Sequence, residues 1–187
     1  MHTVKRQTAA ARSVIAAQLA TSSSEPVVLW VDTDYEADAV MQSLRGVDGV
    51  VEVRGSMSPE KKEANLAAFA DGSARVIVTK PSICGFGLNW QHCALTVFVG
   101  RSFSYESWYQ AVRRFWRFGQ QRTVNVHLIV AEGEDSIGRV IDRKSDDHLR
   151  MKAAMRIAMQ RNNEINSALK VAYNPTHSGR LPSWFTV

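Results

Sequence analysis

The sequence lacks the features that define secreted, membrane-spanning and zinc-binding proteins. Its two cysteines, Cys84 and Cys93, provide no disulfide framework and suit a reducing compartment. His92 precedes Cys93, but no cysteine pair has the spacing of a zinc site, so we expect no metal. No apolar run approaches the ~18 residues of a membrane span. The Ala-rich start is helical in its spacing and has no signal-peptide core, so we expect a cytoplasmic protein that is not secreted.

The composition is that of an ordinary globular protein with an excess of positive charge. Hydrophobic residues make up 45% of the 187 residues and charged residues 22%, which is enough for a buried core. The length suggests one domain with an appendage. The net charge of +5 is compatible with a polyanionic partner, although it says nothing about the fold.

Short apolar runs alternate with helical patterns along most of the chain. Helix start signals are the capping-box spacing of Thr33 and Glu36 and the Ser58-Pro59 pair, and another helix is predicted over residues 104–118. This alternation predicts an α/β fold, a parallel sheet flanked by helices, with an N-terminal helix and a helical C-terminal extension. The predicted strands are residues 26–31, 50–54, 74–79, 94–99 and 124–130. The predicted domains are residues 1–24 (helix and linker), 25–148 (the α/β lobe) and 149–187 (helical extension and polar tail).

Ligands of such sheets gather at the carboxyl ends of the strands. The segments that follow the predicted strands are rich in glycine, hydroxyls and aromatic rings, and we expect them to be loops on one edge of the sheet. They are Asp32-Thr33, "GSMS", "TKPSICGFGLNWQ" and "GRSFSYESWYQ". The segment "GFGLNW" is either a tight turn or a backbone that approaches a phosphate or a neighbouring domain, with Asn89 as its polar anchor.

The stretch "YQAVRRFWRFGQQRT" threads arginines through aromatic residues. On a helix, Gln110, Arg114 and Arg117 would fall at i, i+4 and i+7 on one face, with Arg113 and Trp116 rotated off it. Two arginines one turn apart make a fork for a nucleotide phosphate. The alternative is a basic helix face that simply lies in water.

The spacing Q-x-x-x-R-x-x-R-x-G-Q resembles the last motif of superfamily-two helicases in its Swi/Snf-type form. "VTKPSICGFGLN" is similar to the preceding motif of that family, and the strand–helix units at residues 27–44 and 53–72 resemble those that open the same lobe. The resemblance covers residues 27–144 in the family's order. It implies the second RecA-like lobe of an ATP-driven nucleic-acid motor.

The resemblance also implies roles for individual residues. Arg114 and Arg117 resemble the pair that reaches toward ATP, with Arg117 as the arginine finger. Gln110 resembles the glutamine that seats them. The implied nucleotide-side loop contains Gly85, Gly87 and Asn89. The implied nucleic-acid contacts are Thr79 or Ser82 as the hydroxyl, Lys80, Arg54 and Ser56. The chain departs from the family in a longer stretch between Thr79 and Gly85 and in Trp116, where the family commonly has histidine.

The sequence contains no G-x-x-x-x-G-K-[ST] motif and no Asp-Glu box to hold magnesium. We therefore expect ATP and Mg²⁺ to be bound mainly by a separate Walker-bearing lobe, in cis or in trans, with DNA or RNA as the second partner and a nucleoid-associated location as one option. Two other hypotheses stay open, a stand-alone nucleic-acid-binding module and a protein-interaction domain. The basic helical pattern beyond residue 139 either packs back on the sheet, which we favour, or forms a phosphate-tracking surface.

Overall fold

The computed structural model describes residues 2–84, 88–100, 102, 104–131 and 135–168. The chain divides into two compact units, residues 1–145 and 146–187, which are treated separately below. The first unit contains the sheet and all the residues of the candidate site.

The first unit is built on five parallel strands. They are β1 (Val27–Trp30), β2 (Val50–Val53), β3 (Val76–Thr79), β4 (Leu95–Phe98) and β5 (Asn125–Leu128), in the spatial order β2-β3-β1-β4-β5. Strand β1 is central, with Val27 opposite Val76 on one side and Leu95 on the other. The predicted parallel α/β fold is confirmed, and the ends of each predicted strand lie within two residues of the observed ones.

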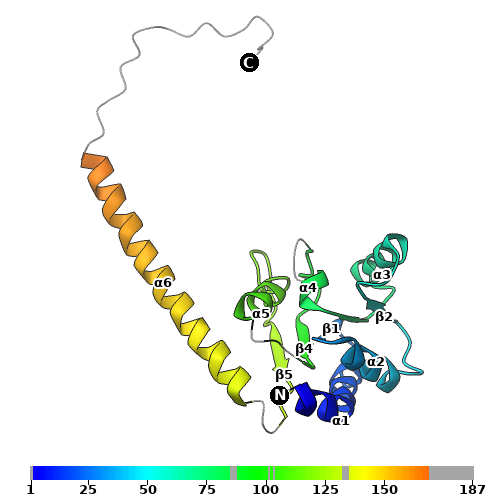
Figure 1. Ribbon diagram of the computed structural model, residues 1–187. Helices are drawn as coiled ribbons and strands as arrows, with labels where there is room; N and C mark the ends of the chain where they lie inside the picture. The colour runs from blue at the N-terminus through cyan, green and yellow to red at the C-terminus, as the bar shows by residue number, and fades with distance from the viewer. Residues whose placement is uncertain (1, 85–87, 101, 103, 132–134, 169–187) are drawn as a thin grey trace, which may run out of the picture. The chain divides into compact units, whose positions relative to one another are not determined.

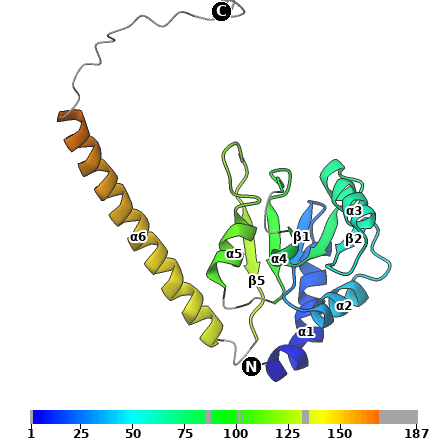
Figure 2. The same cartoon turned by 45° about the horizontal axis from the view of Figure 1, so that its top comes forward.

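Helices cover both faces of this sheet (Figures 1 and 2). Helices α1 (His2–Thr21) and α2 (Asp34–Ser43) pack together on one face. Helices α3 (Pro59–Asp71), α4 (Pro81–Cys84) and α5 (Tyr105–Val112) lie on the other. Helix α3 begins as predicted, because the Ser58 side chain accepts a hydrogen bond of 3.3 Å from the Lys61 N–H and Pro59 opens the first turn.

The alternation of side chains along the strands divides the core into two clusters. Val27, Leu29 and Val31 face the alanine-rich surface of α1 and α2. The opposite face carries a cluster of rings around Trp30, whose centroid lies 5.8 Å from that of Trp90 and 6.1 Å from that of Phe98. Small side chains on one face and large rings on the other therefore position two different helix layers.

The predicted helix over residues 104–118 is wrong in its second half, because α5 ends at Val112. Beyond that point the N–H groups of Arg114 and Phe115 bond to carbonyls three residues back, each at 3.1 Å. Phe115 is fully buried, with its ring centroid 6.1 Å from that of Trp90. The chain turns into the core here, so Gln110, Arg114 and Arg117 do not share one helix face as predicted.

The segment after β3 also differs from the prediction. It was expected to be a loop throughout, but residues 81–84 form the single turn of helix α4. Pro81 occupies the first position of this turn, where its missing N–H costs nothing, and Cys84 is buried in the ring cluster.

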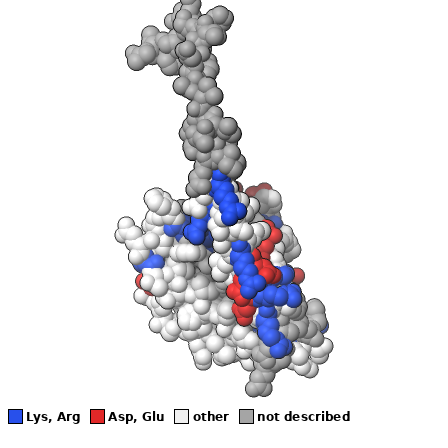
Figure 3. Space-filling view, turned by 90° about the vertical axis from the view of Figure 1, so that its left-hand side faces the viewer, with Lys and Arg blue, Asp and Glu red and all other residues white. Residues whose placement is uncertain are grey.

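Helix α6 (Asp135–Ala168) runs from the end of the first unit through the described part of the second. Figure 3 shows its Lys and Arg side chains as a band with acidic side chains beside it. Its large apolar side chains beyond residue 145 are exposed, among them Leu149, Met155 and Met159. No helix among the described residues is long and apolar enough to cross a membrane.

A buried ion pair joins α1, α2 and the ends of two strands. The Arg12 guanidinium lies 2.7 Å from a Glu36 carboxylate oxygen, and the two side chains are 3% and 0% exposed. Arg12 also donates to the carbonyls of Val99 and Lys5. The second Glu36 oxygen accepts from the N–H groups of Asp32 at 2.9 Å and Thr33 at 3.1 Å. The predicted capping role of Glu36 is thus part of a larger network that orders the carboxyl end of β1.

Gly100, which follows β4, leaves the space that this carboxylate occupies. A Cβ atom at residue 100 would lie 2.3 Å from a Glu36 oxygen, far inside van der Waals contact. A residue with any side chain at this position would displace Glu36 or the turn after β4.

We expect Arg12→Ala to lower the free energy of unfolding by about 3–5 kcal/mol, because it leaves the Glu36 carboxylate buried without its partner. The measurement is urea unfolding followed by the fluorescence of the buried Trp30 and Trp90. Arg45→Ala is the matched control, since Arg45 is exposed and its loss should change stability by no more than about 0.5 kcal/mol. Equal midpoints for the two variants would contradict a structural role for the pair.

Candidate functional site

The strand order places four of the post-strand segments side by side at the carboxyl edge of the sheet. Across the sheet, Arg54 follows β2, Lys80 follows β3, Asp32 follows β1 and Gly100 follows β4. The prediction that these segments share one edge is confirmed by this topology.

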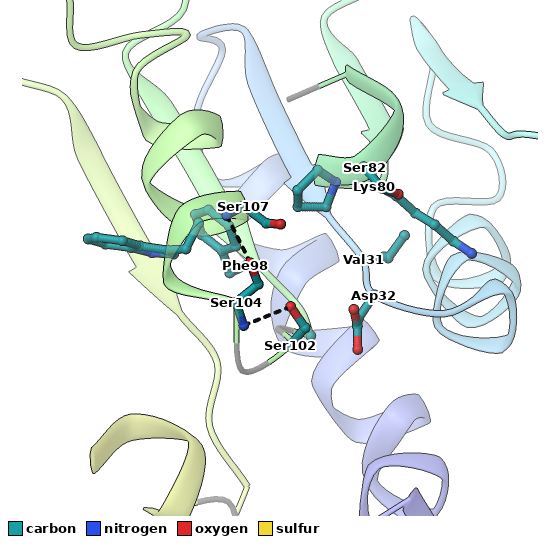
Figure 4. Close-up of a pocket in the computed structure, with 11 residues that line it drawn as sticks. Val31, Asp32, Lys80, Ser82, Phe98, Ser102, Ser104 and Ser107 are labelled. Carbon is teal, nitrogen blue, oxygen red and sulfur yellow. Dashed lines mark hydrogen bonds between the residues drawn. The ribbon is translucent and has the colours of Figure 1, made fainter. Parts of the chain in front are cut away.

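A small cavity opens at the centre of this edge (Figure 4). Its volume is about 70 Å³, and ligand sites that enclose a whole small molecule are usually ~300–1,000 Å³, so it has room for one chemical group. Asp32, Ser82 and the serines around the start of α5 line it. The Ser104 hydroxyl caps α5 by accepting from the Ser107 N–H at 3.2 Å, and Ser102 accepts from the Ser104 N–H at 3.2 Å.

The charged residues of the edge are paired with one another. Lys80 lies 2.9 Å from Asp34 at the start of α2, and Lys5 of α1 lies 2.8 Å from Asp32. In Figure 4 the Lys80 side chain extends away from the serines. The hydrogen bond from Lys80, together with its charge, holds the pKa of the Asp34 carboxyl below its usual value. Lys80, a predicted nucleic-acid contact, is therefore neutralised by a carboxylate of its own chain.

Arg54 is neutralised in the same way. Its guanidinium contacts Glu52 of β2 and lies 2.6 Å from Asp38 of α2. Partial burial acts to lower the pKa of Arg54, but the hydrogen bonds to Glu52 and Asp38 outweigh it and raise the pKa. The sequence placed Arg54 near Lys80 but carried no signal that α2 would supply an acid to each.

The hydroxyl groups predicted to contact nucleic acid differ in their exposure. Thr79 is 1% exposed, and its hydroxyl donates to the Val53 carbonyl at 3.0 Å, with the Cys84 sulfur 3.3 Å from the same oxygen. It ties β3 to β2 and α4 and faces the interior. Ser82 and Ser56 are exposed, so of the two alternatives at this point only Ser82 can meet an external phosphate.

The arginines of the Q-x-x-x-R-x-x-R motif form a second cluster. Arg114 donates to the carbonyl of Leu88 at 2.9 Å and to that of Gln110 at 3.2 Å. The Trp90 N–H in turn donates to the Arg114 carbonyl at 3.2 Å. These bonds bring the motif beside Leu88–Trp90, which includes the exposed Asn89. Gly85 and Gly87, the other predicted residues of that loop, lie outside the described residues.

Arg117 is exposed and lies close enough to Arg114 for the two charges to interact. Burial and then the charge of Arg117 lower the pKa of Arg114. Among the residues that the structure describes, neither arginine lies within 4 Å of a carboxylate. Arg113 is set apart from this pair, with its guanidinium 5.5 Å from the centre of the Trp116 ring.

The end of the motif is held by contacts that sequence spacing did not predict. Gly119 has φ of 95°, a conformation that favours glycine, and Gln91 donates from its side chain to the Phe118 carbonyl. Gln120 donates back to the Gln91 carbonyl at 2.9 Å. The Gly-Gln ending therefore anchors the turn that carries the arginines.

The site fits an anionic ligand and offers no cation site of its own. In the described part of the chain, no group of three Asp, Glu, His or Cys side chains is arranged to hold a metal ion. The guanidinium groups of Arg114 and Arg117 have the charge and geometry that suit an anion with several oxygens.

Comparison with known proteins identifies a family and relatives for this chain. Residues 10–119 match the family model of the helicase conserved C-terminal domain. Over 80 residues, 42% of this chain, the sequence is 34% identical to the TATA-binding protein-associated factor BTAF1 of Arabidopsis thaliana. The chain covers 4% of the length of that relative.

Two solved structures share the fold. The C-terminal part of the Fun30 ATPase domain matches with a TM-score of 0.60 and 18% identity, over 70% of this chain and 43% of that one. The C-terminal domain of the DEAD-box protein Dbp5 matches with a TM-score of 0.62 and 14% identity, over 73% of this chain and 79% of that one. The three comparisons together confirm the resemblance to the C-terminal lobe of a superfamily-two helicase of Swi/Snf type, with its RecA-like fold.

Proposed function

We propose, from the premise that this chain belongs to the helicase conserved C-terminal domain family, that it is the second motor lobe of an ATP-dependent nucleic-acid translocase. It supplies Arg114 and Arg117 to an ATP site that a Walker-bearing lobe completes, in cis or in trans. The same lobe offers a phosphate-contacting surface at the carboxyl edge of its sheet. Both roles go beyond what family membership establishes.

The observation that carries the proposal is the unneutralised arginine pair. Arg114 is oriented by two backbone carbonyls, which leave its positive charge uncompensated, and Arg117 is exposed beside it. Holding two like charges together is unfavourable unless an anion joins them. A nucleotide phosphate has the charge and the several oxygens that a guanidinium fork matches.

This arrangement suits phosphoryl transfer. Negative charge spreads over the γ-phosphoryl oxygens in the transition state, and an arginine placed there raises the rate by ~10³–10⁵ in known cases. Arg114 is the oriented member of the pair and Arg117 the exposed one, so Arg117 is the finger. Asn89 and Gln110 flank them, and ATP and Mg²⁺ are held mainly by the partner lobe.

The nucleic-acid surface consists of Lys80, Ser82, Arg54 and Ser56, which follow the neighbouring strands β2 and β3. These side chains suit phosphate oxygens, and a small cavity capped by the start of α5 lies beside them. Contacts of this kind position a backbone without reading its sequence.

We expect Arg117→Ala and Arg117→Lys to lower ATP turnover by ~10³–10⁵ when this chain is combined with a Walker-bearing first lobe. Lysine should fail because its point charge cannot fork two phosphate oxygens. The measurement is steady-state ATPase rate beside DNA affinity, which should stay unchanged. The chain alone should show no DNA-stimulated hydrolysis.

Arg113→Ala is the matched control for this experiment. It removes the same charge as Arg117→Ala, four residues earlier in the chain, from a side chain whose guanidinium lies over the Trp116 ring. Turnover should be largely retained. If Arg113→Ala and Arg117→Ala reduced turnover equally, bulk charge would explain the effect and the finger assignment would be wrong.

We expect DNA binding by the chain to be weak, nearly independent of sequence and steeply reduced by salt, because phosphates dominate the contacts. Fluorescence anisotropy with two unrelated duplexes at two salt concentrations measures this. Lys80→Ala should weaken binding to both duplexes alike. Salt-insensitive binding, or a strong preference for one duplex, would count against a translocation surface.

A further inference from the structure

Two carboxylates of helix α2 lie against the two cations of the nucleic-acid surface. Asp34 pairs with Lys80 at 2.9 Å, and Asp38, one helical turn later, pairs with Arg54 at 2.6 Å. The i, i+4 spacing puts both acids on one side of α2, and the strand order β2-β3 puts both cations beside it. Helix α2 thus supplies one exposed acid to each cation, and Arg54 has Glu52 of β2 as a further, half-buried partner.

We propose that Asp34 and Asp38 compete with nucleic-acid phosphates for Lys80 and Arg54, and so set the affinity of this lobe for DNA. The proposal rests on the function proposed above and adds a restraint on it. Each carboxylate occupies the position that a phosphate oxygen would take beside the cation.

The exposed fractions of the four side chains favour replacement of the two carboxylates by phosphates. The Asp34 and Asp38 side chains are 72% and 67% exposed, while those of Lys80 and Arg54 are each 22% exposed. Exposed carboxylates in ion pairs are held weakly and are screened by salt, so an incoming phosphate can displace them. The half-buried cations remain in place on the sheet edge and keep their positive charge.

The arginines proposed to meet the nucleotide differ from Lys80 and Arg54 in their carboxylate partners. Arg114 and Arg117 have no carboxylate within 4 Å among the described residues, whereas Lys80 has one and Arg54 has two. If acids were scattered over the surface to balance charge, both groups of cations would be expected to have them. The two exposed acids lie on α2, and the third, Glu52, is a half-buried residue of β2 beside Arg54.

The alternative is that these ion pairs serve stability alone. Asp34 is the first residue of α2, where a negative charge is favourable to a helix in any case. An effect on the fold would change the urea midpoint of unfolding, whereas competition would change DNA affinity and its salt dependence. The two explanations therefore make separate predictions.

The experiment compares Asp34→Asn, Asp38→Asn and the double variant with the unchanged chain, using anisotropy of a fluorescently labelled DNA duplex. We expect the double variant to bind about two- to tenfold more tightly, in keeping with the strength of exposed ion pairs. The slope of log affinity against log salt should steepen by about 0.9 for each phosphate newly contacted.

Asp71→Asn is the matched control. It makes the same change in net charge as each single variant, on an exposed carboxylate at the end of α3, on the amino side of β3. It should leave affinity unchanged. Adding Lys80→Ala and Arg54→Ala to the double variant should remove the gain.

Each other outcome overturns the proposal. An equal gain from Asp71→Asn would mean that total charge, and no local competition, governs binding. No gain from the double variant, in a chain whose binding is weakened by Lys80→Ala, would refute the competition and leave the proposed function standing. If neither the unchanged chain nor any variant bound DNA, the competition and the nucleic-acid part of the proposed function would both fail.

Discussion

The carboxylate of Glu36 is the constraint on which the carboxyl edge of the sheet depends. It neutralises Arg12 of α1, accepts from two N–H groups after β1, and needs the absence of a side chain at Gly100 after β4. A buried ion pair is only weak evidence for stability, because desolvation offsets much of its attraction. The main effect of this ion pair is to position the surrounding backbone. It fixes where β1 ends and where α2 begins, and α2 carries the acids that meet Lys80 and Arg54.

The charges of the lobe fall into three classes that differ in burial and in partner. Arg12 and Glu36 are buried and satisfied, so they can act only on the fold. Lys80 and Arg54 are half-buried, and each is paired with an exposed acid of α2 that can be exchanged, although Arg54 also keeps the half-buried Glu52 beside it. Arg114 and Arg117 have no acidic partner among the described residues. A net charge of +5 therefore conveys little by itself, because the environment decides which cations are available to a polyanion.

Much of the fold could be predicted because local signals and tertiary structure agree. The apolar runs became strands, and the Ser58-Pro59 start of α3 was correct. Prediction failed where a tertiary contact overrode a local pattern. Residues 113–118 look helical in sequence, but burying Phe115 between Trp30 and Trp90 turns the chain inward. The family resemblance implied Thr79 or Ser82 as the phosphate-contacting hydroxyl, and the Thr79 hydroxyl instead donates to a buried carbonyl. The acids that α2 supplies to Lys80 and Arg54 come from another element, so the local spacing around these cations could not predict them.

Because α5 ends at Val112, the helix does not orient Arg114 and Arg117. The segment Leu88–Trp90 contacts Arg114 instead. On a continuous helix, Arg114 and Arg117 would be oriented by the helix alone. In the turns that replace it, the Arg114 side chain is held by the Leu88 carbonyl, and its own carbonyl holds the Trp90 N–H. A shift of the segment at Leu88–Trp90 must therefore shift Arg114, because two hydrogen bonds and the packing of Trp90 on Phe115 connect them. Arg114 is therefore positioned by a segment that follows β3 as well as by the turns of its own motif.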